Sequence, residues 1–126
     1  MIRVFTSKTQ KIGELGENLA VKFLKREGFT IVCQNYTKKQ GEIDIIAKKQ
    51  GILYFFEVKA SVARKYVSHE TYNPAENMHL KKIQKFLRTV EIYLLEKNVS
   101  CETRVILLSV LINKENKKAK VQMIDF

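Results

Sequence analysis

The feature that most constrains the fold is an apolar run from Val105 to Ile112 that carries no charged residue. The run is far shorter than the ~20 residues that a membrane-spanning helix needs. An uninterrupted apolar segment of this length is typical of a buried strand. We therefore expect a sheet in which residues 101–112 form a long interior strand.

Two amphipathic helices are predicted outside this strand. Apolar residues recur at spacings of three and four over residues 8–27, and Gly28 follows as a stop signal. The second helix is expected to begin at Asn73, which can cap it, with Pro74 in the first turn, and to end near Asn98. Both helices carry one apolar side, so each is expected to pack against the sheet.

Strand patterns account for most of the remaining chain. The predicted strands are residues 29–35, 41–47, 52–58, 101–112 and 119–126. Residues 60–72 show no clean period and are expected to form a loop. The resulting order is helix, three strands, helix and two strands, without a repeat or a linker. This order predicts a single α/β domain over residues 1–126.

The charge balance points to a polyanionic partner. The formal net charge is +10, and each half of the chain carries +5, so the basic excess is spread over the surface. Such a surface favours nucleic acid or anionic lipid, although many soluble proteins are basic too. The N-terminal residues lack the apolar core of a signal peptide, and we expect a cytoplasmic protein without a membrane partner. Cys33 and Cys101 lie far apart without a CxxC motif, which argues against a zinc or redox motif.

One acidic residue interrupts an apolar strand. Glu57 lies within residues 52–58, and strand alternation places it on the same face as Lys59. If Gln50 and Gly51 form a two-residue turn, opposed residues sum to 101, and Asp44 faces Glu57. Two carboxylates opposed in this way repel each other and need a positive partner. A lysine could supply it, and so could a hard divalent cation, which prefers oxygen ligands.

A third acidic residue is expected near this pair. Glu17 lies below Ala20, Val21 and Leu24 on the first helix, which indicates a half-buried carboxylate. On its own, Glu17 could equally pair with a lysine on the helix surface. Glu57 and Lys59 could likewise form an ordinary ion pair at a strand end. The hairpin register favours the functional interpretation, because it ties Asp44 to Glu57 by geometry as well as by spacing.

Four motifs carry a resemblance to a known family. They are Gly13-x-x-Gly16-Glu17-x-x-Ala20, Asn35, Gly41 to Ala47 (GEIDIIA) and Phe55 to Lys59 (FFEVK). In order and spacing, the chain resembles the YraN-like bacterial family of uncharacterised, endonuclease-like small proteins. That family is similar to archaeal Holliday-junction resolvases and to PD-(D/E)xK nucleases. The resemblance implies a restriction-endonuclease-like α/β core, in which helices flank a central mixed five-stranded sheet.

The resemblance also implies roles for the site residues. Asp44 and Glu57 would bind Mg²⁺ or Mn²⁺ with help from the Val58 carbonyl, and Glu17 would act at or beside the metal. Lys59 would orient or activate the attacking water. The implied activity is metal-dependent hydrolysis of phosphodiesters in branched or structured DNA.

Several basic residues are candidates for binding the nucleic-acid backbone. They are Lys38, Lys39, Arg64, Lys81, Lys82, Lys85 and Arg88. The stripe on the second helix could equally be a solvated helix face. Two alternatives to a nuclease stay open: a non-catalytic nucleic-acid-binding module and a module that binds an acidic protein. A homodimer is expected, because a two-fold enzyme suits the cutting of two strands.

Overall fold

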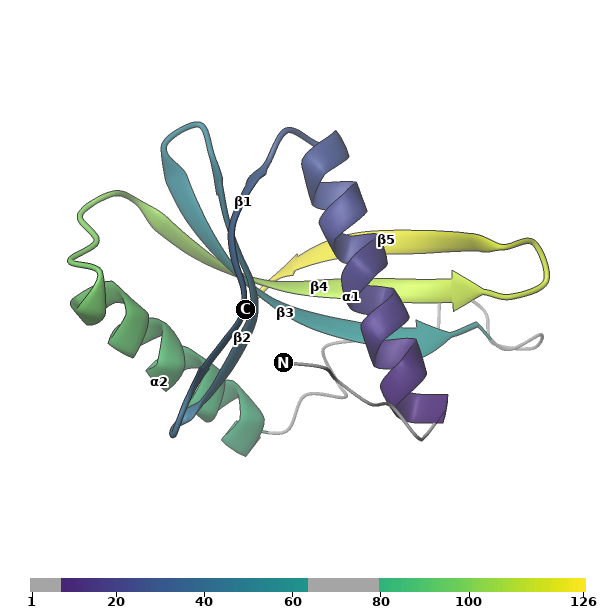
Figure 1. The fold of residues 1–126 in the computed structure, drawn as a ribbon, viewed down its shortest axis with the longest axis horizontal. Coiled ribbons are helices and arrows are strands. Elements are labelled where there is room, and N and C mark those ends of the chain that lie inside the picture. Colours follow the sequence, from purple (N-terminus) through teal and green to yellow (C-terminus); the bar gives the residue numbers. More distant parts are fainter. Residues whose placement is uncertain (1–7, 64–79) are drawn as a thin grey trace.

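The computed structural model describes residues 8–63 and 80–126. Within these residues the elements follow the predicted order, with helix α1 before three strands and helix α2 before two more (Figure 1). Their bounds are α1 Lys8–Arg26, β1 Thr30–Lys38, β2 Gly41–Lys49, β3 Ile52–Val62, α2 Leu80–Glu96, β4 Thr103–Asn113 and β5 Lys118–Asp125. The α/β class and the order of elements are therefore confirmed.

The strands form one mixed sheet in the order β1-β2-β3-β4-β5. Strands β3 and β4 pair in parallel, and the other neighbours pair antiparallel. Parallel neighbours need a crossover connection, and α2 lies in the segment of chain that makes it. The mixed five-stranded sheet expected from the sequence is thus present in the described residues.

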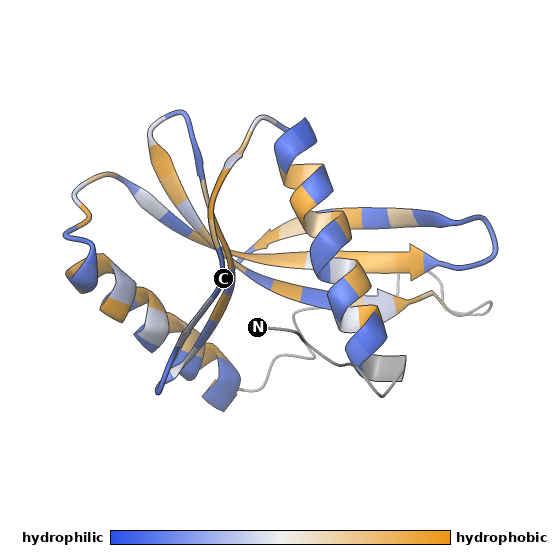
Figure 2. Cartoon of the chain, viewed as in Figure 1, coloured by the Kyte–Doolittle hydropathy of each residue, from blue (hydrophilic) through white to orange (hydrophobic). Residues whose placement is uncertain are grey.

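The two helices cover opposite faces of the sheet. Ala20 and Leu24 of α1 pack in one core cluster with Phe56 of β3. Phe86 and Tyr93 of α2 pack with Phe55, the neighbouring residue of the same strand. Neighbouring side chains of a strand point to opposite faces, so the sheet has an α1 face and an α2 face. Figure 2 shows β4, which contributes to both clusters, as an almost continuous apolar strand.

Residues with positive φ lie at the C-terminal ends of both helices and in the turn between β2 and β3. Gly28 has φ +91° directly after α1, and Asn98 has φ +51° after α2, which are the left-handed conformations typical of helix C-termini. Gln50 and Gly51 both have positive φ and form the predicted two-residue turn between β2 and β3.

One expected loop is partly wrong. Residues 60–62 were assigned to a loop, but they continue β3, which pairs with β4 as far as Val62 opposite Ile112. This pairing joins segments that are distant in sequence, so the local pattern did not reveal it. Residues 64–72 of that loop, the cap at Asn73 and the first turn at Pro74 lie outside the described residues. Neither described helix is long and apolar enough to cross a membrane.

Candidate functional site

The centre of the candidate site lies where β2 and β3 stop pairing. Their described pairs run from Lys49 opposite Ile52 to Ile45 opposite Phe56, all in the predicted register. The next opposed positions are Asp44 and Glu57. There the backbone pairing ends, and Asp44 Oδ2 instead accepts a hydrogen bond from the Val58 N–H at 2.7 Å. The hairpin therefore brings the two acidic residues together, as the register predicts.

The carboxyl groups of Asp44 and Glu57 interact directly. Glu57 is only 6% exposed. Burial, and then the negative charge of Asp44, raise the pKa of Glu57 to about 7. Burial also raises the pKa of Asp44, while the hydrogen bond from Val58 opposes this shift. In this arrangement the two groups hold a proton that isolated carboxyls would have lost well below neutral pH. The pair is thus a place where added positive charge is stabilising.

Positive charge reaches the pair from α2. The Nζ atom of Lys82 lies 3.2 Å from Glu57 Oε1 and lowers the pKa values of both carboxyl groups. The helical pattern had placed Lys82 among residues that bind nucleic acid. The structure places its ammonium group on the acidic pair instead.

Lys59 occupies the strand position expected of it. It lies two residues after Glu57 on β3, on the same face, and is opposite Ser109 of β4. No ion pair between Glu57 and Lys59 is present, and in the described part of the chain the ion pair of Glu57 is with Lys82. The simple strand-end ion pair that the sequence allowed is therefore not formed.

Glu17 lies near Asp44 from the α1 side, in a cleft whose lining does not include Glu57 or Lys59. It is half-buried, as expected, and it lines a cleft of about 240 Å³ with Asp44. The cleft is lined by Gln10, Gly13, Glu14, Glu17, Asn35, Glu42, Asp44 and Val58. The preceding residue explains how α1 comes so near: a Cβ at Gly16 would overlap the Cβ of Ala60 on β3. The missing side chain allows α1 to lie directly against β3 beside Glu17.

Asn35 is one motif of the family resemblance, and the structure places it beside Asp44, a position for which the sequence predicted no role. It lies on β1 between Gln34, which pairs with Ile45, and Tyr36, which pairs with Ile43, so Asp44 is its lateral neighbour. Its φ is +53°, and its Oδ1 is buried without a hydrogen-bond partner in the described structure. A buried acceptor without a donor is costly and calls for a ligand, a water or a cation. The sequence signals for Asn35 were its place among the four motifs of the resemblance and an asparagine within a strand pattern.

These groups suit a hydrated divalent cation. The donors are all oxygens: the carboxylates of Asp44 and Glu57, with Glu17 and the Asn35 amide in the adjoining cleft. The N–H and C=O of one strand residue point to the same edge, so the Val58 carbonyl faces the edge where Asp44 lies. Mg²⁺ keeps several waters and needs only one or two protein carboxylates. In the described ranges, no group of three or more His, Cys, Asp or Glu side chains is placed to hold a metal ion, so a cation here would depend on two carboxylates and on water.

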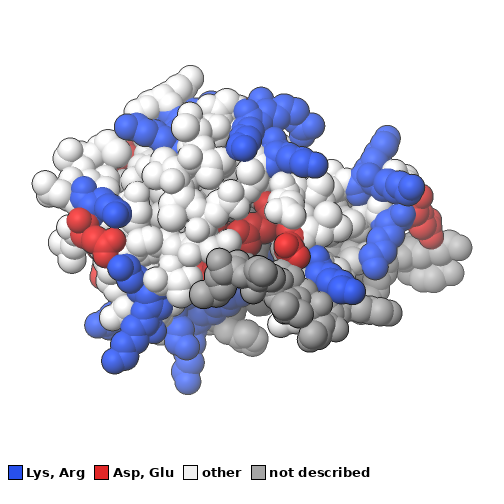
Figure 3. Space-filling model, viewed as in Figure 1, with Lys and Arg blue, Asp and Glu red and all other residues white. Residues whose placement is uncertain are grey.

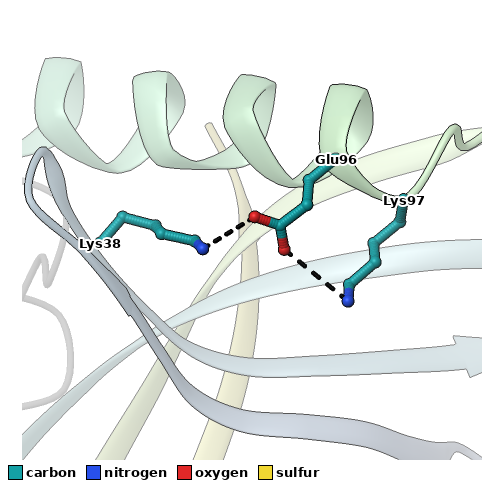
Figure 4. Close-up of polar contacts among 3 residues, drawn as sticks. All are labelled: Lys38, Glu96 and Lys97. Carbon is teal, nitrogen blue, oxygen red and sulfur yellow. Dashed lines mark ion pairs between the residues drawn. The ribbon is translucent and has the colours of Figure 1, made fainter.

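Of the predicted nucleic-acid contacts, Lys38 and Lys82 form ion pairs, and the other described members are exposed. Lys38 is not a free cation, because its Nζ lies 2.7 Å from Glu96 Oε2, and Lys97 approaches the other oxygen at 3.7 Å (Figure 4). The exposed members are Lys39, Lys81, Lys85 and Arg88. Arg64 lies outside the described residues.

The surface surrounds acidic groups with basic ones. Figure 3 shows acidic side chains together near the middle of one face, with Lys and Arg side chains mainly around its periphery. Such a distribution attracts a polyanion to the surface and a cation to the centre.

Comparison with known proteins identifies relatives along most of the chain. A family model described as "Uncharacterised protein family UPF0102" matches residues 16–110. A UPF0102 protein of Campylobacter jejuni subsp. jejuni is 42% identical over 98 residues, which are 78% of this chain and 81% of the relative. One of Campylobacter hominis is 40% identical over 108 residues, 86% of this chain and 88% of the relative. One of Campylobacter fetus subsp. fetus is 34% identical over 119 residues, 94% and 97% of the two chains.

Proposed function

The chain belongs to the uncharacterised protein family UPF0102, and we propose that it is a metal-dependent nuclease that hydrolyses phosphodiesters in branched or structured DNA. The membership confirms the resemblance to the YraN-like family. The nuclease proposal extends beyond it and rests chiefly on one observation: Asp44 and Glu57 are in contact at the point where β2 and β3 separate. The restriction-endonuclease-like character of the core is part of the same proposal.

Each residue has a distinct role in this proposal. Asp44 and Glu57 would bind Mg²⁺ or Mn²⁺ through carboxylate oxygens, Val58 through its carbonyl, and Glu17 would act beside them. The chemistry that the cation supplies when bound is polarisation of the scissile phosphate. Lys59 would orient the attacking water and offset negative charge that develops on the phosphate oxygens.

The reaction is an ordinary hydrolysis. The water oxygen bonds to phosphorus, and one P–O ester bond breaks. One water proton goes to the leaving oxygen, and the other goes to solvent. Exposed basic side chains such as Lys39, Lys85 and Arg88 would bind the DNA backbone through its phosphates. The proposed setting is the cytoplasm, with a homodimer as the form that cuts two strands.

A cleavage assay tests the proposal. Wild-type protein is incubated with a labelled four-way junction or a linear duplex in Mg²⁺ or Mn²⁺. Cleavage of the junction is expected, with a loss of at least about 100-fold in Asp44→Asn and Glu57→Gln, since each removes a proposed ligand. Asp125→Asn and Glu91→Gln make the same chemical changes at exposed positions and should cleave normally. Equal cleavage by all five proteins would indicate a contaminating nuclease.

One observation favours a second candidate, a nucleic-acid-binding module without activity. In the described ranges the acidic side chains do not form a complete metal cage. Such a module would bind DNA with a strong salt dependence and would be indifferent to EDTA. Binding without cleavage, unchanged by chelation and by Asp44→Asn, would select it over the nuclease.

A further inference from the structure

The charge partner of the acidic pair comes from a different element than the sequence implies. Glu57 is buried, but its ion-pair partner Lys82 has a side chain that is 52% exposed. The ammonium therefore reaches a buried carboxylate from the surface of α2. Lys59, on the same strand as Glu57, forms no such pair within the described ranges.

Lys82 is suited to leave this position as well as to occupy it. A lysine ammonium is a compact point charge on a flexible four-carbon stem. Half of the side chain is already in solvent, so the ammonium has a direct route from Glu57 into water. The neighbouring Lys81 and Lys85 are exposed on the same helix, and within the described ranges neither forms an ion pair with Asp44 or Glu57, which makes them suitable controls.

We propose that Lys82 occupies the position of the divalent cation beside Glu57 and is displaced from it when the cation binds. The ammonium released in this way lies next to the bound cation, where it can contact a phosphate oxygen of the substrate. The inference rests on the proposed function, since it requires a cation at Asp44 and Glu57. It differs from a simple backbone contact in that Lys82 and the cation compete for one carboxylate.

Competition between Lys82 and the cation predicts the direction in which the affinity for the cation changes. Removal of Lys82 frees Glu57, so the cation should bind more tightly; an ion pair of about 1 kcal/mol corresponds to roughly 5-fold in affinity. The experiment titrates Mn²⁺ into the full chain by isothermal calorimetry, in wild type, Lys82→Met, Lys81→Met and Lys85→Met. We expect the Kd for Mn²⁺ to fall by about 5-fold in Lys82→Met and by less than about 2-fold in the two controls, which lose the same charge without the contact.

A second readout addresses the substrate. At saturating Mn²⁺, Lys82→Met should raise the KM for the four-way junction by about 10-fold with a smaller effect on kcat, and Lys82→Arg should restore most of the loss. A merely structural role for Lys82 would lower both parameters with the amount of folded protein and would not tighten Mn²⁺ binding.

The possible outcomes are distinct. Equal Mn²⁺ affinity in all four proteins, with cleavage intact, overturns the role of Lys82 and leaves the proposed function standing. Absence of Mn²⁺ binding in wild type and in Lys82→Met overturns the proposed function and the role of Lys82 together. Mn²⁺ binding that is detected only in Lys82→Met supports the competition directly.

Discussion

Asp44 Oδ2 accepts the backbone N–H of Val58 at 2.7 Å, across the point where β2 and β3 separate. A side chain thus replaces the next step of the backbone ladder. Asp44 also lines the cleft that Glu17 lines. The same contact that ends the hairpin pairing therefore orients the candidate ligand.

The stability of the metal-free protein should depend on pH through Glu57. Its pKa rises from the usual 4.5 to about 7 on folding, because burial and Asp44 disfavour the charged form. The stabilisation is therefore fully present below pH 4.5 and is lost as the pH rises towards 7, by at most about 3 kcal/mol. Urea unfolding in EDTA at pH 5 and at pH 7.5 measures it. Glu57→Gln should remove most of this difference, and a wild-type stability that rises over the interval would contradict the prediction.

Divalent cations should stabilise the folded chain at neutral pH. A ligand that binds only the native state at 100 times its Kd adds about 2.7 kcal/mol, which shifts the Tm by several degrees. Thermal unfolding with Mn²⁺, and again after EDTA, checks this. The shift should be absent from Asp44→Asn and present in Asp125→Asn, whose altered side chain is exposed and does not line the cleft.

Asn35 should affect stability through its backbone conformation and Mn²⁺ binding through its side chain, and the two effects should be separable. Its φ of +53° is favourable for glycine and tolerable for asparagine, so Asn35→Ala should cost about 1 kcal/mol and Asn35→Gly much less. Both variants lose the buried Oδ1, and both should weaken Mn²⁺ binding alike. Denaturant titration and calorimetry measure the two effects. Mn²⁺ affinity that follows stability instead would assign Asn35 a purely structural role.

Two glycines of α1 should respond in opposite directions to alanine. Gly16→Ala places a Cβ on the Cβ of Ala60 and should cost about 1–3 kcal/mol, because α1 must move away from β3. Gly13 has no atom within 4 Å of a built Cβ, so Gly13→Ala should stabilise the helix by about 0.5–1 kcal/mol. Equilibrium unfolding compares them. The double variant Gly16→Ala with Ala60→Gly should recover part of the loss; no recovery would place the clash elsewhere.

The ion pair between Lys38 and Glu96 should mask one cation from nucleic acid. Lys85→Met should weaken duplex binding and reduce the salt slope by about 1, whereas Lys38→Met should do less, since Glu96 already neutralises it. Glu96→Gln should strengthen binding, because it releases Lys38 and Lys97. Fluorescence anisotropy at several salt concentrations measures all three. Equal effects of Lys38→Met and Lys85→Met would show that Glu96 does not compete with phosphate.

Local chemistry explains what could be predicted from the sequence. A two-residue turn at Gln50 and Gly51 fixes the pairing of β2 with β3, so the meeting of Asp44 with Glu57 followed from counting. Periodicity likewise placed α1 and its half-buried Glu17. In each case the determining contacts lie within one hairpin or one helix.

The features that could not be predicted from the sequence depend on contacts between distant segments. Residues 60–62 join β3 only because β4 pairs beside them, and Lys82 reaches Glu57 only because α2 packs on that face. The cleft that Asn35 lines is built from three strands and from α1. No pattern within one segment reports how such segments meet, which is why Lys82 was assigned to the helix surface.

The placement of the acidic pair on one hairpin has a consequence for the order of folding. Asp44 and Glu57 are brought together by closure of a single short loop, while Lys82 arrives only when the crossover between β3 and β4 docks. Short loops close with less entropy loss and faster than long-range parallel pairings. We therefore expect Asp44 and Glu57 to meet first during folding and Lys82 to join them last. Because the two carboxylates then repel each other without a partner, a divalent cation in the folding medium should speed the early step.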